Sequence, residues 1–136
     1  MADIHKGRCQ CGAVEYEFTG PPQTIHACHC SECQKRSGSA FGLTMVVNRK
    51  NFTITGQVST YVRAADSGQT NTSYFCPNCG NPIYGEVERL PDIVAIRPGT
   101  LDDTSWFKPE RHIWTDSAQS WFEFPEGCEV LPKGRW

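Results

Sequence analysis

Three cysteines lie close together in the stretch Cys28-His29-Cys30-Ser31-Glu32-Cys33. A thiolate is a soft ligand, so three of them at this spacing favour a thiophilic metal ion, above all zinc. A structural zinc site has four protein ligands in a closed tetrahedron, whereas a catalytic site keeps one position open. The stretch therefore leaves two possibilities. Either a fourth protein ligand closes the site, or the fourth position is free for a substrate.

Two further cysteine pairs predict a separate, structural zinc site. The turn Cys76-Pro77-Asn78-Cys79-Gly80 has the form of a zinc knuckle, which supplies half of a tetrahedron. The pair Cys9-Gln10-Cys11 cannot close a site alone and is its natural partner. We expect four thiolates to hold this metal: Cys9, Cys11, Cys76 and Cys79. Closing so long a loop costs chain entropy, so metal binding would contribute directly to folding.

The eighth cysteine, Cys128, lies alone near the C-terminus, and nothing around it marks it as a ligand. Two interpretations of the second cluster follow. In the first, Cys28, Cys30 and Cys33 hold a catalytic zinc with an open position. In the second, Cys128 or a histidine completes another structural site. A single cysteine is commonly just a small apolar residue, which favours the open site.

Eight cysteines in this chain favour metal binding over disulfides. The first six residues contain no hydrophobic region that could act as a secretory signal, so we expect a cytoplasmic protein in a reducing compartment. Thiols one residue apart, as in Cys9-Gln10-Cys11, are also poorly placed to pair with each other.

Length and charge narrow the function classes. A chain of 136 residues is of ordinary size for one domain, so we predict a single zinc domain over residues 1–136. The net charge is -2 and the basic residues are scattered, which argues against a nucleic-acid partner. No apolar run has the length of a membrane span. The sequence gives no oligomeric state.

Hydrophobic alternation predicts a mainly β fold of short, mostly antiparallel strands with little helix. One or two helical turns are expected over residues 31–36, with Ser31 near the N-cap, and a hairpin turn at Asp66-Ser67-Gly68. Strands are expected over residues 13–18, 24–27, 41–47, 52–55, 60–63, 70–75, 83–87 and 93–96, followed by a loop-rich tail.

The charge of the second cluster indicates its chemistry. Three thiolates on a divalent ion leave a formal charge of about -1, so the metal would polarise water or a carbonyl weakly. It could still deprotonate an incoming thiol, because a coordinating thiol loses its proton outright. We therefore expect the substrate to be a thiol or an adduct of one.

The motifs together resemble the glutathione-dependent formaldehyde-activating enzyme family, which includes the domain of centromere protein V. The match runs in order and spacing over roughly residues 5 to 125, and seven cysteines fall at matching places. The motifs that carry it are Gly7-Arg8-Cys9-Gln10-Cys11-Gly12-Ala13-Val14, Cys28-His29-Cys30-Ser31-Glu32-Cys33 with Gly38-Ser39-Ala40-Phe41, Phe75-Cys76-Pro77-Asn78-Cys79-Gly80-Asn81-Pro82-Ile83, Gly99-Thr100-Leu101-Asp102-Asp103 and His112-Ile113-Trp114.

The resemblance implies an Mss4-like fold, a β-tent with two zinc sites. It places the structural zinc on Cys9, Cys11, Cys76 and Cys79, and the catalytic zinc on Cys28, Cys30 and Cys33. The implied activity is the reversible addition of glutathione to formaldehyde, giving S-(hydroxymethyl)glutathione, by a carbon-sulfur lyase. The implied partners are a small thiol such as glutathione and a small aldehyde.

Several other residues admit a functional or a structural role. His29 could relay a proton or line a pocket, but a structural or solvated role is favoured. Lys35 or Arg36 could pair with a substrate carboxylate, although an exposed cationic turn is the simpler interpretation. His112 is expected to be a core histidine. The aromatic residues are expected in the core or a pocket wall: Trp106, Trp114, Trp121 and Phe122.

The leading hypothesis is a zinc-dependent carbon-sulfur lyase acting on a thiol-carbonyl adduct. Two alternatives remain at this point. One is a zinc hydrolase of an imine-like adduct, which the charge argument disfavours. The other is a non-catalytic zinc module that binds a protein partner.

Overall fold

The computed structural model describes residues 3–64 and 68–134. The chain divides into two compact units, the first formed by Met1–Gln23 with Met45–Trp106 and the second by Thr24–Thr44 with Phe107–Trp136. Within the described ranges, one short α-helix and three 3-10 turns are the helical elements, and strands form most of the rest. The prediction of a mainly β chain with little helix is therefore confirmed.

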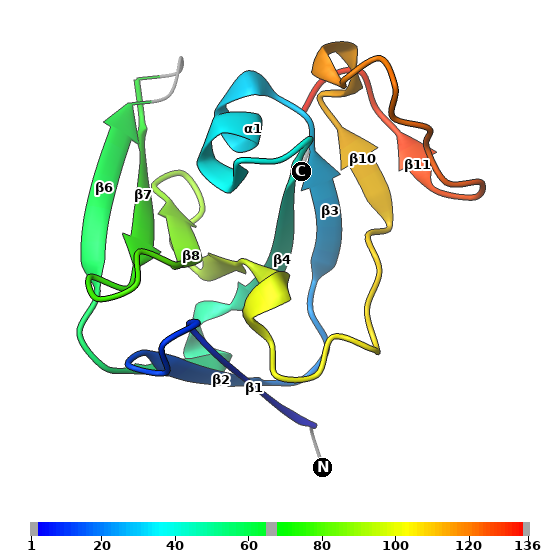
Figure 1. Ribbon diagram of the computed structural model, residues 1–136. Helices are drawn as coiled ribbons and strands as arrows, with labels where there is room; N and C mark the ends of the chain where they lie inside the picture. The colour runs from blue at the N-terminus through cyan, green and yellow to red at the C-terminus, as the bar shows by residue number, and fades with distance from the viewer. Residues whose placement is uncertain (1–2, 65–67, 135–136) are drawn as a thin grey trace. The chain divides into compact units, whose positions relative to one another are not determined.

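The first unit contains two antiparallel arrangements of strands (Figure 1). One has the order β1-β2-β5 and the other the order β4-β9-β8-β7-β6. The strand bounds are β1 Ile4–Arg8, β2 Glu15–Thr19, β4 Gly42–Asn48, β5 Phe52–Thr55, β6 Ser59–Ala64, β7 Thr70–Phe75, β8 Pro82–Val87 and β9 Ile93–Ile96. The boundary between the units falls within β4, whose residues from Met45 onward pair with β9.

Alternation of apolar and polar residues correctly predicts β2 and its buried face. Val14, Tyr16 and Phe18 are 0%, 3% and 0% exposed, while Glu15 and Glu17 between them face solvent. Side chains on a strand point alternately to the two faces, which is why a period of two identifies a half-buried strand. In contrast, all four residues of β9 are buried, as expected of a strand covered on both faces.

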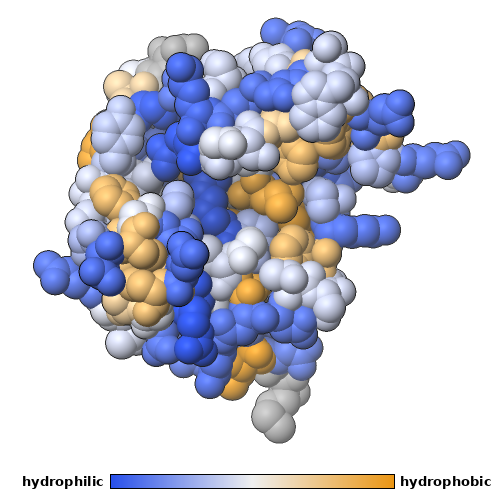
Figure 2. All heavy atoms as spheres, in the orientation of Figure 1, coloured by the Kyte–Doolittle hydropathy of each residue, from blue (hydrophilic) through white to orange (hydrophobic). Residues whose placement is uncertain are grey.

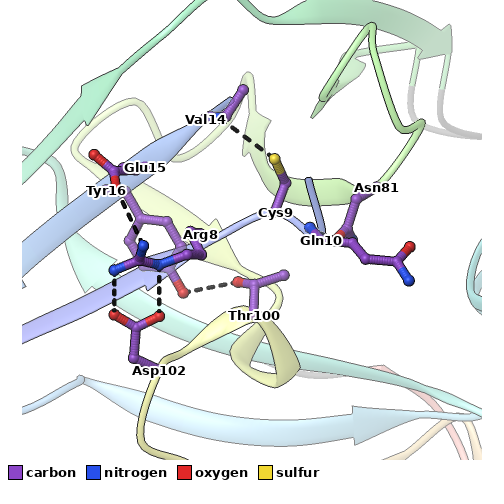
Figure 3. Close-up of polar contacts among 9 residues, drawn as sticks. All are labelled: Arg8, Cys9, Gln10, Val14, Glu15, Tyr16, Asn81, Thr100 and Asp102. Atoms are coloured by element: carbon purple, nitrogen blue, oxygen red, sulfur yellow. Dashed lines mark hydrogen bonds and ion pairs between the residues drawn. The ribbon is translucent and has the colours of Figure 1, made fainter. Parts of the chain in front are cut away.

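Two side-chain contacts tie the β1–β2 hairpin to the turn near Leu101 (Figure 3). The guanidinium of Arg8 donates two hydrogen bonds of 3.1 Å to the carboxylate of Asp102 and also lies 3.5 Å from Glu15. The hydroxyl of Tyr16 lies 2.8 Å from that of Thr100, which belongs to the 3-10 turn η2 (Pro98–Thr100). The hairpin is thereby fixed against a segment more than 80 residues away.

The second unit is built on strand β3 (Thr24–Cys28), all of whose residues are buried. Beyond its C-terminal end lies helix α1 (Ser31–Ser37), and beside it lies β10 (Arg111–Ile113) (Figure 1). The outer strand is β11 (Glu129–Val130). The other two 3-10 turns are η1 (Arg49–Asn51), in the first unit, and η3 (Thr115–Ser117), in the second.

The pairing of β3 with β10 and of β10 with β11 is parallel, which differs from the antiparallel pairing that dominates elsewhere. Parallel neighbours need a long crossover connection, and the segment between β3 and β10 spans more than 80 residues. The sequence gives no local signal for it. The predicted turn at Asp66-Ser67-Gly68 lies mostly outside the described residues.

Gly7 provides a test of the close packing in the β1–β2 hairpin. It lies opposite Tyr16, and a Cβ atom on Gly7 would come within 2.4 Å of the tyrosine ring. We expect Gly7→Ala to lower the free energy of unfolding by about 1–3 kcal/mol, because the ring must move or the strands must separate. Denaturant unfolding measures the change.

Gly99→Ala is the matched control, since a Cβ atom there has nothing within 4 Å. Equal effects of the two substitutions would contradict the assigned packing of Tyr16.

Candidate metal centres

The first cluster brings together four thiols from two distant turns of the first unit. Cys9 and Cys11 lie in the turn between β1 and β2, and Cys76 and Cys79 lie in the turn between β7 and β8. Their sulfur atoms all lie within 4.8 Å of one another. The structure thus assembles the four residues that the spacing paired.

The sulfur–sulfur distances fit a tetrahedral zinc site. The Sγ of Cys11 lies 3.7 Å from the Sγ of Cys9 and 3.7 Å from that of Cys76. A regular tetrahedron with zinc–sulfur bonds of 2.3 Å has edges of about 3.8 Å. A four-thiol donor set of this size could hold a metal ion without rearrangement.

Backbone geometry explains how the 76–79 turn presents its sulfurs. The amide of Gly80 donates to the carbonyl of Cys76 at 2.8 Å, and Gly80 has a φ of 77°, which favours glycine. The amide of Asn78 points at the sulfur of Cys76, 3.4 Å away. In the other turn, the amide of Gln10 donates to the side chain of Asn81 at 2.9 Å, which joins the two turns (Figure 3).

Hydrogen bonds to sulfur stabilise the thiolate forms that a metal requires. The side-chain amide of Asn78 donates to the Sγ of Cys11 at 3.2 Å and lowers the pKa of that thiol. Backbone amides of Cys11 and Asn81 lower the pKa of Cys79 in the same way. The amide of Val14 lies 3.3 Å from the Sγ of Cys9 (Figure 3).

The second cluster consists of Cys28, Cys30 and Cys33 in the second unit, with sulfurs within 4.8 Å of one another. Cys28 is the last residue of β3 and only 6% exposed, while Cys30 and Cys33 are partly exposed. Among the residues that the structure describes, no further cysteine, histidine, aspartate or glutamate joins this cluster. It therefore offers three protein ligands where the first cluster offers four.

Helix α1 begins at the second cluster and favours charge on one of its sulfurs. Cys30 is the N-cap of α1, and its sulfur accepts from the backbone amide of Cys33 at 3.4 Å. Hydrogen bonds from the thiols of Cys28 and Cys33, together with this amide, hold the pKa of Cys30 far below its usual value. Ser31 is the residue after the N-cap, as the prediction of Ser31 near the N-cap requires, and a cysteine sulfur takes the capping role usually filled by oxygen.

His29 is fully buried and its ring contacts aromatic side chains. It is 0% exposed and its ring lies about 5 Å from those of Phe41, Phe122 and Phe124. Its Nε2 lies 2.8 Å from the Nδ1 of His112, which is 2% exposed. His29 is therefore buried rather than solvated, and His112 has the core position expected for it. Burial lowers the pKa of both rings.

The outer nitrogens of this histidine pair, the Nδ1 of His29 and the Nε2 of His112, are both buried. No group among the described residues forms a hydrogen bond to either of them. A neutral imidazole carries one donor and one acceptor, so the shared bond leaves one donor and one acceptor without partners. Each such buried group costs about 1–3 kcal/mol.

Gln34 fixes the start of α1 to the segments around it. Its side-chain nitrogen donates to the carbonyl of His29 at 2.8 Å and to that of Ser117 at 3.0 Å. Its side-chain oxygen accepts from Gln119 at 3.1 Å, and Gln119 in turn accepts from the indole of Trp121 at 2.7 Å. The sequence contains no sign of this chain of bonds, because Gln34 and Gln119 lie 85 residues apart.

A pocket of about 450 Å³ lies at the C-terminal end of α1. Lys35 is the one cation among its lining residues, which are Gln34, Lys35, Gly38, Ser39, Ala40 and Gln119. Of the two cations considered from the sequence, Lys35 lines this pocket and Arg36 is not among its lining residues.

Other residues named from the sequence lie outside both clusters. The thiol of Cys128 donates to the carbonyl of Pro125 at 3.1 Å. Trp106 and Trp114 are each 37% exposed and Trp121 is 68% exposed, so none of the three is a core residue. Trp106 instead lines a pocket, which is the other position expected for these aromatic residues. Phe122 contacts the two histidine rings. Trp114 has a φ of 55°, an uncommon conformation for a bulky residue.

Comparison with known proteins gives one family. Residues 4–117 match the family described as glutathione-dependent formaldehyde-activating enzyme. A protein of Penicillium rubens, provisionally named as such an enzyme, is 30% identical over 110 residues, covering 77% of this chain and 57% of its own length. A protein of Colletotrichum graminicola with the same provisional name is 31% identical over 127 residues, covering 90% of this chain and 66% of its own length.

The chain thus spans between about half and two thirds of the length of these relatives. Among solved structures, a Rhodobacter sphaeroides protein has a TM-score of 0.58 at 20% identity, covering 76% of this chain and 91% of that one. This likeness is one of fold. Within the described residues, no helix is long and apolar enough to cross a bilayer.

Asn78 provides a test of the first cluster. Metal binding requires thiolates, and the hydrogen bond from Asn78 lowers the pKa of Cys11. We expect Asn78→Ala to raise that pKa, so that protons displace the metal at a higher pH than in the wild type. We also expect about a tenfold loss of metal affinity. A chromophoric chelator, followed during acidification, measures both changes.

Asn51→Ala is the control, since Asn51 lies in η1 and belongs to neither turn. If metal release from Asn78→Ala follows the wild-type pH profile, the bond to Cys11 has no role in metal retention.

Proposed function

Because the chain belongs to the glutathione-dependent formaldehyde-activating enzyme family, we propose that it is a zinc-dependent enzyme that reversibly joins a small thiol to a small aldehyde. The reaction makes or breaks one carbon–sulfur bond, as in a carbon-sulfur lyase. In this proposal, residues 1–136 act as one zinc domain in the cytoplasm, where a reducing environment keeps its thiols free.

The observation that carries the proposal is the difference between the two clusters. Four thiols at tetrahedral distances suit a closed, structural site at Cys9, Cys11, Cys76 and Cys79. The cluster of Cys28, Cys30 and Cys33 has three thiols, and no fourth candidate among the described residues lies within the same range. Catalytic zinc sites characteristically have three protein ligands and an open position.

Charge favours a thiol substrate. Zinc held by three thiolates supplies a centre that stabilises the thiolate form of a further, incoming thiol. The formal charge of about -1 makes such a centre a poor activator of water. Hydrolysis of an imine-like adduct by bound water is therefore the weaker alternative.

The residues of the second unit would bind and orient the reactants. Cys28, Cys30 and Cys33 would hold the metal at the start of α1, and the pocket at the other end of α1 would take the rest of the thiol substrate. Lys35 offers this pocket a positive charge that could pair with a carboxylate. The substrate thiol would lose its proton to solvent before its sulfur bonds to the aldehyde carbon. As that bond forms, the π electron pair of the carbonyl moves onto the oxygen, which takes a proton from solvent. Proximity of the two reactants would supply much of the rate.

Glutathione and formaldehyde are the first substrates to test, because the family and both provisionally named fungal relatives point to them. Glutathione carries carboxylates that Lys35 could bind.

A non-catalytic zinc module that binds a protein partner is the other class of function. It would need a closed second site and an exposed apolar surface. On the face shown in Figure 2, apolar residues form small separate patches among hydrophilic ones. The three-thiol cluster also favours the enzyme.

Metal counting and exchange kinetics test the proposal. We expect native mass spectrometry to find two zinc ions, and the enzyme to accelerate exchange between free and hydroxymethylated glutathione, measured by NMR with labelled formaldehyde. We expect Cys30→Ser to retain one zinc and to leave only the uncatalysed exchange rate, because it removes one of three ligands.

Cys128→Ser is the matched control and should keep two zinc ions and full activity, since this thiol joins neither cluster. Two zinc ions that are equally resistant to a chelator, and whose retention does not change when a thiol is added, would favour the binding module instead.

A further inference from the structure

His29 is held at three points, more than its place between two ligands requires. Its amide donates to the carbonyl of Ile113 at 3.0 Å, and its own carbonyl accepts from Gln34 at 2.8 Å. Its ring nitrogen Nε2 shares a hydrogen bond of 2.8 Å with Nδ1 of His112. The backbone bonds fix the position of residue 29, and the ring bond fixes its rotation.

The rotation of His29 matters because the chain is extended on both sides of it. Cys28 ends strand β3, and Cys30 has extended backbone angles, with φ -65° and ψ 156°. Along an extended chain, successive side chains point to opposite sides. A ring anchored on one side of the segment therefore directs the sulfurs of Cys28 and Cys30 to the other.

Packing alone does not explain histidine at these two positions. The rings lie among Phe41, Phe122 and Phe124, where two apolar side chains could fill the same space. The histidines instead leave two buried nitrogens without hydrogen-bond partners in the part of the chain that the structure describes. What they add over apolar residues is one directional bond between β10 and the ligand segment.

We propose that His112 is a positioning residue for the three-cysteine site. Through its bond to His29 it sets the orientation of the segment that carries Cys28 and Cys30, without touching the metal or the substrate. This inference rests on the proposed metal site, and it assigns to β10 a role in preparing that site for its metal.

Three substitutions of His112 separate positioning from packing. Phenylalanine keeps the packing and removes the bond. Asparagine places an amide group near the position of Nδ1, whereas glutamine places one near Nε2, beyond reach of His29. The readouts are zinc retention at each site against increasing chelator, by native mass spectrometry, and the absorption spectrum of the cobalt-substituted protein.

We expect His112→Phe to fold and to retain its four-thiol zinc, while its three-thiol zinc is lost at a chelator concentration about tenfold lower. The cobalt bands of that site should shift as its geometry loosens. His112→Asn should resemble the wild type, and His112→Gln should resemble His112→Phe. Should the phenylalanine variant fail to fold, the comparison of asparagine with glutamine decides alone.

Equal behaviour of the asparagine and glutamine variants would overturn the inference, as would parallel loss of metal from both sites, which indicates general destabilisation. A wild-type protein that binds a single zinc would refute the proposed function itself. The two failures are thus distinguishable.

Discussion

The first unit brings together thiols that are 65 residues apart, as Cys11 and Cys76 are. One pair of thiols comes from the β1–β2 hairpin and the other from the β7–β8 hairpin, so the cluster joins the two strand arrangements of that unit. The entropy lost in closing a loop grows only slowly with its length. A single metal ion at this point could therefore stabilise many residues on either side.

Both clusters are built from cysteine sulfurs, but they differ in the number of segments that supply them. The first draws on two turns whose amides and side chains already point at sulfur, as with Asn78 and Cys11. The second draws on a single short stretch, in which Cys28 is buried, Cys30 and Cys33 are partly exposed, and the ring of His29 contacts aromatic side chains. The first cluster thus takes its thiols from two distant turns, and the second takes all of its thiols from one segment.

Sequence patterns predicted which cysteines lie together and most of the strands, because cysteine pairs and hydrophobic alternation are visible in short stretches. Val14, Tyr16 and Phe18 show the alternation of β2, and the four-thiol set follows from the need to complete a tetrahedron. Strand β1 was missed because its residues, Ile4–Arg8, are mostly polar and are held by pairing rather than by intrinsic preference. The bond between His29 and His112 has no local signal, since 83 residues separate the two rings.

Helix α1 has only seven residues, far fewer than an isolated helix needs to persist in water. Its order comes from Cys30 at one end, from Gly38 with a φ of 64° at the other, and from the bonds of Gln34. Formation of this helix and assembly of the three thiols are therefore expected to occur together, as one local folding step. The apparent affinity for a metal would then be the intrinsic affinity multiplied by the fraction of molecules in which α1 is formed. Substitutions on its solvent-facing side could retune that affinity in either direction while every ligand stays in place.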